Sequence, residues 1–524
     1  MVTYVYYTCV HKPRQLYRWY SKEFSRLGYK CYSLPFQPFG SPLNQIFLED
    51  TAKGDALLSA KEKFLEFDIL IFNVFNTVFI DIGNPELIQG FFTTDIQGQS
   101  PKLELFAAHI ERAMGAGVVF SEGKVWKRKR KIITSVFNFE FLKSLTWKIA
   151  NISDRSIEAI EEETREKKQR EELEFNLLNL TVNMFSTVMI ECFFGAKASG
   201  EKLDGKHVSV FVTDLVNDVS AQGQDFLYLL FGTKILDIGL KESFRDVNRR
   251  LRLFKQWASG VVAKRIQEAK EKLGEKKGSP EDLIEAFVMS GHFSSTSDDD
   301  GYNEDEIFEE FCTFFIAGTD TTSHFLLMMV YYIAMDPAVE AKLREEIREY
   351  VGGDFSYDNL KKLKYIDWIQ KETTRMYGPV NGVFPRKAEN DSFIKDLPVR
   401  KGTCLMIQPL GNHYSPKYFK DPKAFRPERW EAECDDLHPY VLVGFGGGAR
   451  TCIGKHLALL ESKIALVKIM KRYKRIVLPR TDFKMVQKFV YTPEDFETSS
   501  TLIECISPVM VISEIPMSPR LPTD

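Results

Sequence analysis

The sequence lacks three features that would place it in other classes of protein. Its eight cysteines form no C-x-x-C pair and follow no disulfide or zinc spacing, which argues against a disulfide framework and the common zinc folds. Its net charge is only −3, so composition gives no reason to expect nucleic acid as a partner. It has no internal repeat and no low-complexity tract, which argues against a solenoid or a disordered chain. Scattered single thiols fit a reducing compartment.

The sequence also lacks an apolar run long enough to cross a membrane. Met1–Val10 is apolar and rich in tyrosine, but this run is only about half of the ~20 residues that a bilayer span needs. It carries no small-residue cleavage site of a signal peptide. Polar residues interrupt Leu65–Ile82, whose β-branched and aromatic content predicts one or two buried strands. We therefore expect no transmembrane helix, and residues 1–30 form a candidate membrane-associated segment.

The features that are present predict one large, mainly α-helical domain with small β-sheets. Hydrophobic residues make up 44% and charged residues 27% of the 524 positions, which is the balance of a globular protein. Residues 1–60 look like irregular surface chain, about 100–350 are helical, and short strands follow position 380. No linker separates two cores. We expect a domain over residues 31–512 and a flexible tail at 513–524.

The clearest predicted helix begins after Asn303 and ends near Ala334. Asn303 is a good N-cap, and Glu306 stands at the N3 position of a capping box. About 30 residues at 1.5 Å each span roughly 45 Å, so this helix crosses the core of a large domain. Two other long helices are predicted, from Phe175 to Phe194 and from about Lys241 to Leu273.

The segment from Phe445 to Gly454 reads F-G-G-G-A-R-T-C-I-G and is the most informative stretch. A helix follows it, so Cys452 lies at a helix N-terminus, where free N–H groups and the helix dipole stabilise a thiolate. A thiolate in this place can bind iron axially. The glycines allow close approach to a flat macrocycle, and Arg450 can pair with a carboxylate.

Two other interpretations of this segment are open. One is a buried or reactive thiol after a turn. The other is a dinucleotide-binding loop, because Gly444–Ala449 fits G-x-G-x-x-A between a strand-like Tyr440–Val443 and a helix. Against it, no acidic residue ends the next strand-like segment, Arg475–Leu478, and too little chain follows for further βαβ units.

The pattern Phe445-x-x-Gly448-x-Arg450-x-Cys452-x-Gly454 resembles the haem-binding loop of the cytochrome P450 family. The resemblance implies haem b with Cys452 as the axial iron ligand. It also implies O2 and a lipophilic small molecule as substrates. Electrons would come from NADPH through a redox partner such as a diflavin reductase. Microsomal-type members suggest the cytosolic face of the endoplasmic reticulum membrane, or otherwise the cytoplasm, with peripheral membrane contact.

The family also has a Glu-x-x-Arg motif, and here it occurs several times. Glu23/Arg26, Glu162/Arg165, Glu242/Arg245 and Glu345/Arg348 all fit, and such pairs are ordinary on helix surfaces. Glu372/Arg375 differs because Phe425-x-Pro427-Glu428-Arg429-Trp430, similar to the family's meander, follows it. The resemblance implies that Glu372, Arg375 and Arg429 form a buried charge network that holds the fold.

Further residues match positions that contact haem in similar proteins. Arg386 and the pair Trp126-x-x-x-Arg130 correspond to propionate-binding positions, and Phe445 and Ala317 correspond to positions beside the macrocycle. A basic cluster surrounds the pair. It is either a solvated face or a docking surface for an acidic electron-transfer partner. Its members are Lys124, Lys127, Arg128, Lys129 and Lys131.

The long helix carries Ala317-Gly318-Thr319-Asp320-Thr321-Thr322, which is similar to the family's oxygen-activation motif. The resemblance implies that Thr321 takes part in O2 activation and that Asp320 relays protons. This pair favours a monooxygenase over two alternatives, a haem-thiolate isomerase or dehydratase acting on peroxides and a haem-binding sensor without turnover. We expect Phe311–Phe315, Val380–Phe384 and the regions 95–120 and 210–235 to line the substrate pocket.

Overall fold

The computed structural model describes most of the chain. The described residues are 7–33, 67–94, 101–167, 172–273, 280–289, 301–477, 485–487, 490–493 and 501–505, together with Phe36 and Leu65 and apart from six single positions inside these ranges (75, 103, 196, 224, 354 and 381). The predicted tail at 513–524 lies outside them, as do residues 1–6.

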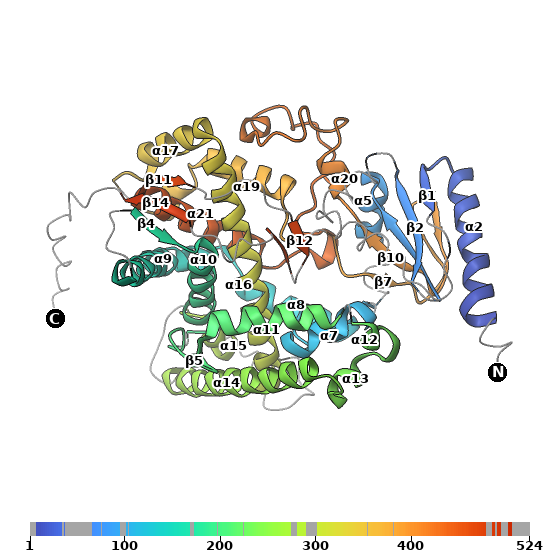
Figure 1. Cartoon of the computed structure of the whole chain (residues 1–524), viewed down its shortest axis with the longest axis horizontal. Helices are drawn as coiled ribbons and strands as arrows, with labels where there is room; N and C mark the ends of the chain where they lie inside the picture. The colour runs from blue at the N-terminus through green and yellow to red at the C-terminus, as the bar shows by residue number, and fades with distance from the viewer. Residues whose placement is uncertain are drawn as a thin grey trace.

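Helices make up most of the molecule and gather in one part of it, while the largest sheet lies at the other end (Figure 1). This confirms the predicted mainly α fold with small sheets. The helices of eight or more residues are α2 (Lys12–Arg26), α5 (Pro85–Thr93), α7 (Glu104–Met114), α8 (Gly123–Val136), α9 (Phe139–Lys167), α10 (Leu177–Thr187), α11 (Val208–Gln222), α14 (Glu242–Leu273), α16 (Glu304–Met335), α17 (Pro337–Val351), α19 (Lys364–Met376) and α21 (Lys455–Arg472).

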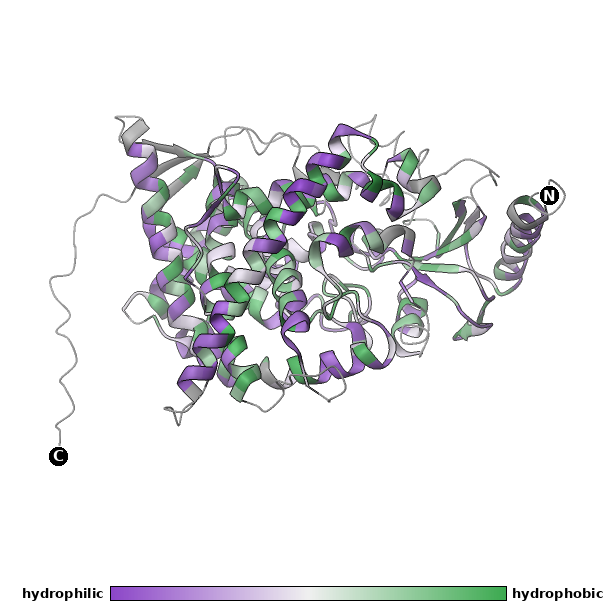
Figure 2. Cartoon of the chain, turned by 90° about the horizontal axis from the view of Figure 1, so that it is seen from below, coloured by the Kyte–Doolittle hydropathy of each residue, from purple (hydrophilic) through white to green (hydrophobic). Residues whose placement is uncertain are grey.

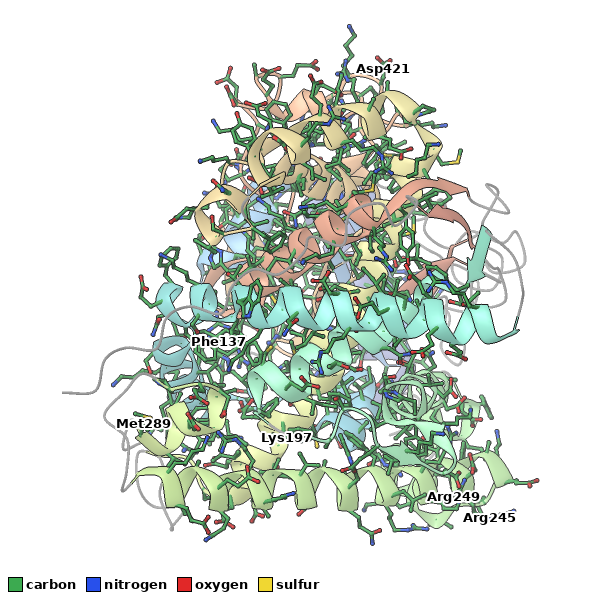
Figure 3. The ribbon with its side chains drawn as sticks, turned by 90° about the vertical axis from the view of Figure 1, so that its left-hand side faces the viewer. Phe137, Lys197, Arg245, Arg249, Met289 and Asp421 are labelled. Atoms are coloured by element: carbon green, nitrogen blue, oxygen red, sulfur yellow. The ribbon has the colours of Figure 1, made fainter. Side chains whose placement is uncertain are left out.

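Shorter helical segments connect the long ones. They are η1 (Tyr7–His11), η2 (Val188–Phe193), α12 (Phe226–Phe231), α13 (Thr233–Ile238), α15 (Leu283–Met289), α18 (Tyr357–Leu360), α20 (Leu410–His413), η3 (Pro427–Trp430) and η4 (Gly448–Arg450). Figure 3 shows α9 and α14 running roughly parallel across the helical part, with Arg245 and Arg249 near one end of α14 and Met289 toward the other.

The largest described sheet has five strands in the order β1-β2-β3-β10-β7. They are β1 (Cys31–Ser33), β2 (Ile69–Val74), β3 (Thr77–Ile82), β10 (Cys404–Ile407) and β7 (Arg386–Lys387). β2 and β3 are antiparallel, and both are buried, as the apolar stretch predicts. The antiparallel pairing of β10 with β7 sets Arg386 opposite Leu405, which fixes Arg386 at the sheet edge.

The remaining strands are short. β4 (Glu172–Phe175), β11 (Tyr473–Val477) and β14 (Thr501–Cys505) form a three-stranded sheet in the order β11-β14-β4. Three two-stranded pairs complete the set: β5 (Lys202–Leu203) with β6 (Lys206–His207), β8 (Ser392–Ile394) with β9 (Leu397–Val399), and β12 (Met485–Gln487) with β13 (Tyr491–Pro493).

Helix α16 is the central element of the helical part. It begins with the predicted capping box of Asn303 and Glu306 and ends at Met335, before the N-cap Asp336 of α17. Most of its side chains are buried, so it packs against neighbours on nearly all sides, including α10, α14 and α21. Other helices alternate hydrophilic and hydrophobic residues along their length (Figure 2).

The structure corrects the interpretation of residues 1–60 as irregular chain. Residues 12–26 form α2, which packs against the sheet through Tyr17, Tyr20 and Phe24. The sequence signal was an amphipathic spacing of aromatics that the nearby prolines and glycines obscured. Within the described residues, no helix combines the length and apolar character needed to cross a bilayer.

Candidate functional site

The Cys452 thiol lies at the start of α21. The turn before it is closed by the Cys452 N–H, which donates to the Phe445 carbonyl at 2.9 Å. Gly446 and Gly448 adopt positive φ angles of +70° and +61°. Glycine adopts such angles without steric cost, so backbone geometry explains why glycine stands at these two positions. The Cys452 side chain has accessible surface. Burial nevertheless raises the pKa of its thiol, because the sulfur lies deep in the molecule.

Several groups around Cys452 favour its ionised form. Backbone N–H groups of Gly454 and Lys455 point at the sulfur and oppose the rise of its pKa, as do the charges of Arg130 and Lys455. Arg130 lies on α8, far away in the sequence, and the Cys452 charge in turn opposes the lowering of the Arg130 pKa by burial. The predicted helix N-terminus is therefore present, and α8 adds a cation to it.

A cluster of three cations shares one carboxylate beside this loop. Glu122 is the N-cap residue of α8, and its Oε1 accepts from Lys102 Nζ at 2.7 Å and from Arg386 at 2.9 Å. Its Oε2 accepts from Arg450. Burial, and then the charge of Arg386, lower the pKa of Lys102 to about 7. Lys102 is then only partly charged near neutral pH, but the charges of Arg386 and Arg450 already exceed that of one carboxylate, so the site favours further negative charge.

Trp126 and Arg130 lie one turn apart on α8, as their spacing predicts. The Arg450 guanidinium stacks on the buried Trp126 ring, 3.9 Å from its centroid. Arg130 is half-buried, and no described residue forms an ion pair or hydrogen bond with its guanidinium. Arg450 Nε is buried and likewise has no hydrogen-bond partner among the described residues. Two of the predicted arginines thus retain free donors.

The predicted oxygen-activation segment occupies the middle of α16. Ala317, Gly318 and Thr321 are only partly buried, whereas their neighbours Thr319 and Asp320 are buried. The Thr321 hydroxyl donates to the Ala317 carbonyl at 2.6 Å. A Cβ at Gly318 would lie 2.5 Å from Met189 Sδ of η2, so the glycine permits close packing there. α21, which follows Cys452, packs against α16.

The Glu372–Arg375–Arg429 cluster is completely buried, with all three side chains at most 1% exposed. Arg375 donates twice to Glu372, at 2.7 and 2.9 Å, and Arg429 Nε donates to it at 3.0 Å. Trp430 Nε1 and the Arg426 N–H fill the remaining carboxylate positions, each at 3.0 Å.

Backbone carbonyls accept nearly all of the remaining arginine donors of this cluster. They belong to His413, Pro422 and Ala424 for Arg375, and to Lys420, Asp421 and Ala424 for Arg429. The predicted network is therefore present and internally satisfied. It fastens α19 to the segment 413–430.

The structure differs from two expectations about side chains. Phe311 and Phe315 pack against Trp257 of α14, and Phe314 stacks on Phe137, so Phe311–Phe315 mostly builds core between helices. A helix presents side chains all around its axis, and only part of this run can face any one site. The strand expected at Tyr440–Val443 is a turn, so the dinucleotide-binding loop lacks its first strand.

The basic cluster on α8 also divides in two. Arg128 donates to Glu306, and the Nζ of buried Lys129 lies 3.1 Å from Oε2 of Glu309. These two ion pairs join α8 to the start of α16. Lys124, Lys127 and Lys131 are exposed. Only these three remain for a docking surface.

Sequence reasoning missed three buried or partly buried groups. Lys102 and Glu122 join the cation cluster through tertiary contacts alone, since an isolated bridge aligns Lys102 with Arg386. Glu461 of α21 is fully buried and accepts from Thr322 of α16, and burial raises its pKa to about 8. No local spacing signals these partners. A glutamate among apolar residues of a core helix was the one hint for Glu461.

Comparison with known proteins identifies the class. A family model described as Cytochrome P450 matches residues 44–498. The chain is 28% identical to mouse cytochrome P450 4V2 over 69% of its own length and 68% of that protein. It is 27% identical to cytochrome P450 6B7 of Helicoverpa armigera (70% and 71%) and 26% identical to human cytochrome P450 3A5 (69% and 70%). The chain belongs to the cytochrome P450 family, and it is a haem-dependent monooxygenase.

The residues present fit the haem that this family implies. Haem b carries a macrocycle and two carboxylates. The accessible thiol at the start of α21 suits its iron, and the cation excess of Lys102, Arg386 and Arg450 suits its carboxylates. The donors left over on Arg130 and Arg450 suit the same groups.

Proposed function

We propose that Cys452 is the axial thiolate ligand of the haem iron and that residues 31–512 form the catalytic domain. The observation that carries this proposal is the thiol itself, accessible at the start of α21, with the Gly454 and Lys455 N–H groups and the Arg130 charge directed toward it. In this reading Arg130, Arg386, Arg450 and Trp126 hold the haem carboxylates, and Phe445 and Ala317 pack beside the macrocycle.

When bound, the haem supplies the chemistry that splits O2, so that one oxygen atom enters the substrate and the other becomes water. The chain's own groups then have three tasks. Cys452 supplies the thiolate, and the surrounding N–H groups favour its ionised form. Thr321 is only partly buried and presents its hydroxyl on α16. The neighbouring Asp320 supplies a buried carboxyl for proton transfer. Glu372, Arg375 and Arg429 hold the fold.

The electrons come from NADPH through a diflavin reductase. The exposed Lys124, Lys127 and Lys131 of α8 support this proposal, because they form a basic surface on the helix that also carries Trp126 and Arg130. An acidic partner docked there would lie close to the proposed cofactor site.

The substrate is a lipophilic small molecule, and the protein works at the cytosolic face of the endoplasmic reticulum membrane. Four large apolar side chains in and after α12 and α13 are at least 60% exposed, which favours contact with lipid. They are Phe226, Phe231, Ile238 and Leu240. Figure 1 shows α12 and α13 in the half of the molecule that also holds α2 and the N-terminus.

The ferrous–CO absorption spectrum of the purified protein tests the central assignment. We expect a Soret band at the thiolate position in the parent and its loss in Cys452→Ala. Cys434→Ala is the matched control, because Cys434 lies in a turn of the same region and its loss should not affect the band. A Cys452→Ala protein that kept the thiolate band would overturn the assignment.

Thr321→Ala separates the monooxygenase from its two alternatives. A monooxygenase variant should release hydrogen peroxide uncoupled from product, because the hydroxyl beside the reacting oxygen is lost. A peroxide isomerase or dehydratase would turn over without NADPH or a reductase. A sensor would show no change in any turnover assay.

A further inference from the structure

A small, mainly apolar cavity with a few polar groups lies between α11 and α16, on the side of the proposed oxygen-activation segment that faces α11. Its polar lining comes from Ser209 and Thr213 of α11 and from Thr319 and Asp320 of α16. The remaining lining is apolar. The space is sufficient for about one water molecule.

The Thr319 hydroxyl identifies this space as a site for an ordered water. Thr319 is 5% exposed, and its Oγ1 has no hydrogen-bond partner among the described residues. Leaving a buried hydroxyl unpaired costs about 1–3 kcal/mol. Ser209, Thr213 and Asp320 line the same cavity and are candidates for the further partners, two to four in all, that a buried water needs.

Ser209 connects the cavity to a titratable group near the surface. It is buried, and its Oγ lies 2.7 Å from His207 Nδ1 and donates to Asn183 Oδ1 of α10. His207 is the N-cap of α11 and is half-buried in β6, next to the exposed end of the β5–β6 hairpin. Burial lowers the pKa of His207. A hydrogen bond to the Ser199 carbonyl opposes this lowering, and the charge of Lys202 lowers the pKa further. An imidazolium formed there gives up its proton readily.

We propose that His207, Ser209 and one water in this cavity form a proton-relay path that leads from the surface to Asp320. The inference rests on the proposed function of Asp320 and Thr321. Each turnover combines substrate, O2, two electrons and two protons into hydroxylated product and water. The electrons come from the redox partner. For each proton, the Ser209 hydroxyl turns from Asn183 Oδ1 to the water. His207 gives its Nδ1 proton to Ser209 Oγ, the Ser209 hydroxyl proton passes to the water, and the water protonates Asp320. Solvent then reprotonates His207.

Two substitutions separate proton transfer from structure. Ser209→Ala removes the hydroxyl link, and Ser209→Thr restores it. His207→Asn keeps a good N-cap acceptor for the Ser209 N–H but removes the titratable imidazole. The matched control is Ser186→Ala on α10, whose buried hydroxyl donates to the Asn183 carbonyl outside the cavity.

Each haem-loaded protein is reconstituted with a diflavin reductase and assayed with alkoxycoumarin and alkoxyresorufin probes, using the first probe that the parent turns over. Product, NADPH use and hydrogen peroxide are measured in H2O and D2O. Ser209→Ala and His207→Asn should lose coupled product formation on the order of 100-fold, the lower end of what a positioned proton donor contributes. They should release more peroxide and show a larger solvent isotope effect. Ser209→Thr and Ser186→Ala should behave like the parent.

The proposal is overturned if His207→Asn and Ser209→Ala keep the parental ratio of product to NADPH and the parental isotope effect. It is also overturned if they lose activity with an unchanged isotope effect, because that is the result of structural damage alone. Failure of the proposed function has a different signature, since the parent itself would then lack the thiolate CO spectrum or form no product.

Discussion

Two groups of buried arginines meet a glutamate in this molecule, and they are satisfied to different extents. Around Glu372, two arginines, an indole N–H and a backbone N–H fill the carboxylate positions, and six hydrogen bonds to backbone carbonyls take up arginine donors. Around Glu122, three cations share one carboxylate, and Arg450 Nε has no partner among the described residues.

This difference separates a structural cluster from a binding cluster. A buried charge is tolerated when its neighbours satisfy its donors and acceptors, and the Glu372 cluster comes close to this condition by itself. The Glu122 cluster is complete only when further negative charge joins it. Unbalanced cations beside an accessible thiol are the feature that a ligand with carboxylates would complete.

The largest expected effect is on the stability that the Glu372 cluster gives to the fold. Glu372→Gln leaves two buried guanidinium groups without their counter-charge, so we expect a loss of about 3–5 kcal/mol in the free energy of unfolding. Little soluble holoprotein should form. The measurement is the yield of haem-loaded protein together with its thermal unfolding midpoint.

Glu23→Gln is the matched control, because Glu23 and Arg26 have the same Glu-x-x-Arg spacing on exposed α2. We expect no measurable change in the unfolding midpoint. Equal damage from both substitutions would contradict the distinction between a buried network and a surface pair.

The second effect is on the binding cluster and should spare the fold. Arg386→Gln removes the charged hydrogen bond that we propose between Arg386 and the cofactor. Such a bond contributes about 1.5–3 kcal/mol, so haem release to an acceptor apoprotein should become on the order of 10- to 100-fold faster. Arg400→Gln, which breaks an exposed ion pair with Asp391, serves as control. If Arg386→Gln instead prevents folding while haem release stays unchanged, the cluster is structural as well.

A third effect concerns Glu461, a buried carboxyl that accepts a hydrogen bond from the neutral Thr322. Burial raises its pKa to about 8, so the folded protein holds this proton where the unfolded chain has lost it. Stability therefore falls as pH rises from the ordinary carboxyl range toward 8, by up to about 1.4 kcal/mol per pH unit. Glu461→Gln should flatten the pH dependence of the unfolding midpoint between pH 5 and about 8. An unchanged slope would show that Glu461 is ionised or hydrated in the folded protein.

The smallest expected effect comes from Glu122→Gln. It removes the carboxylate that competes with an anionic ligand for the three cations. Haem release should become slower by roughly two- to fivefold, in line with about 0.2–1 kcal/mol for a partly exposed ion pair. Faster haem release would mean that Glu122 mainly holds Arg386 and Arg450 in place.

Much of the fold and of the candidate site could be predicted from local sequence. The capping box of α16 and the i, i+4 spacing of Trp126 and Arg130 are properties of single segments, and the structure contains them. Helix α2 was missed because prolines and glycines nearby masked its amphipathic spacing. Phe311 and Phe315 were expected near the substrate but pack against α14, because direction around a helix depends on its neighbours.

The sequence by itself determined the class of this protein, because short motifs with fixed spacing in the Cys452 loop, α16 and α19 carry that information. Tertiary structure alone decided which charges meet. Lys102, Glu122, Arg386 and Arg450 lie on separate segments, and only folding shows that one carboxylate serves three cations while Glu372 is fully matched. The reason is physical: electrostatic balance depends on distance and burial, and neither is encoded in local spacing.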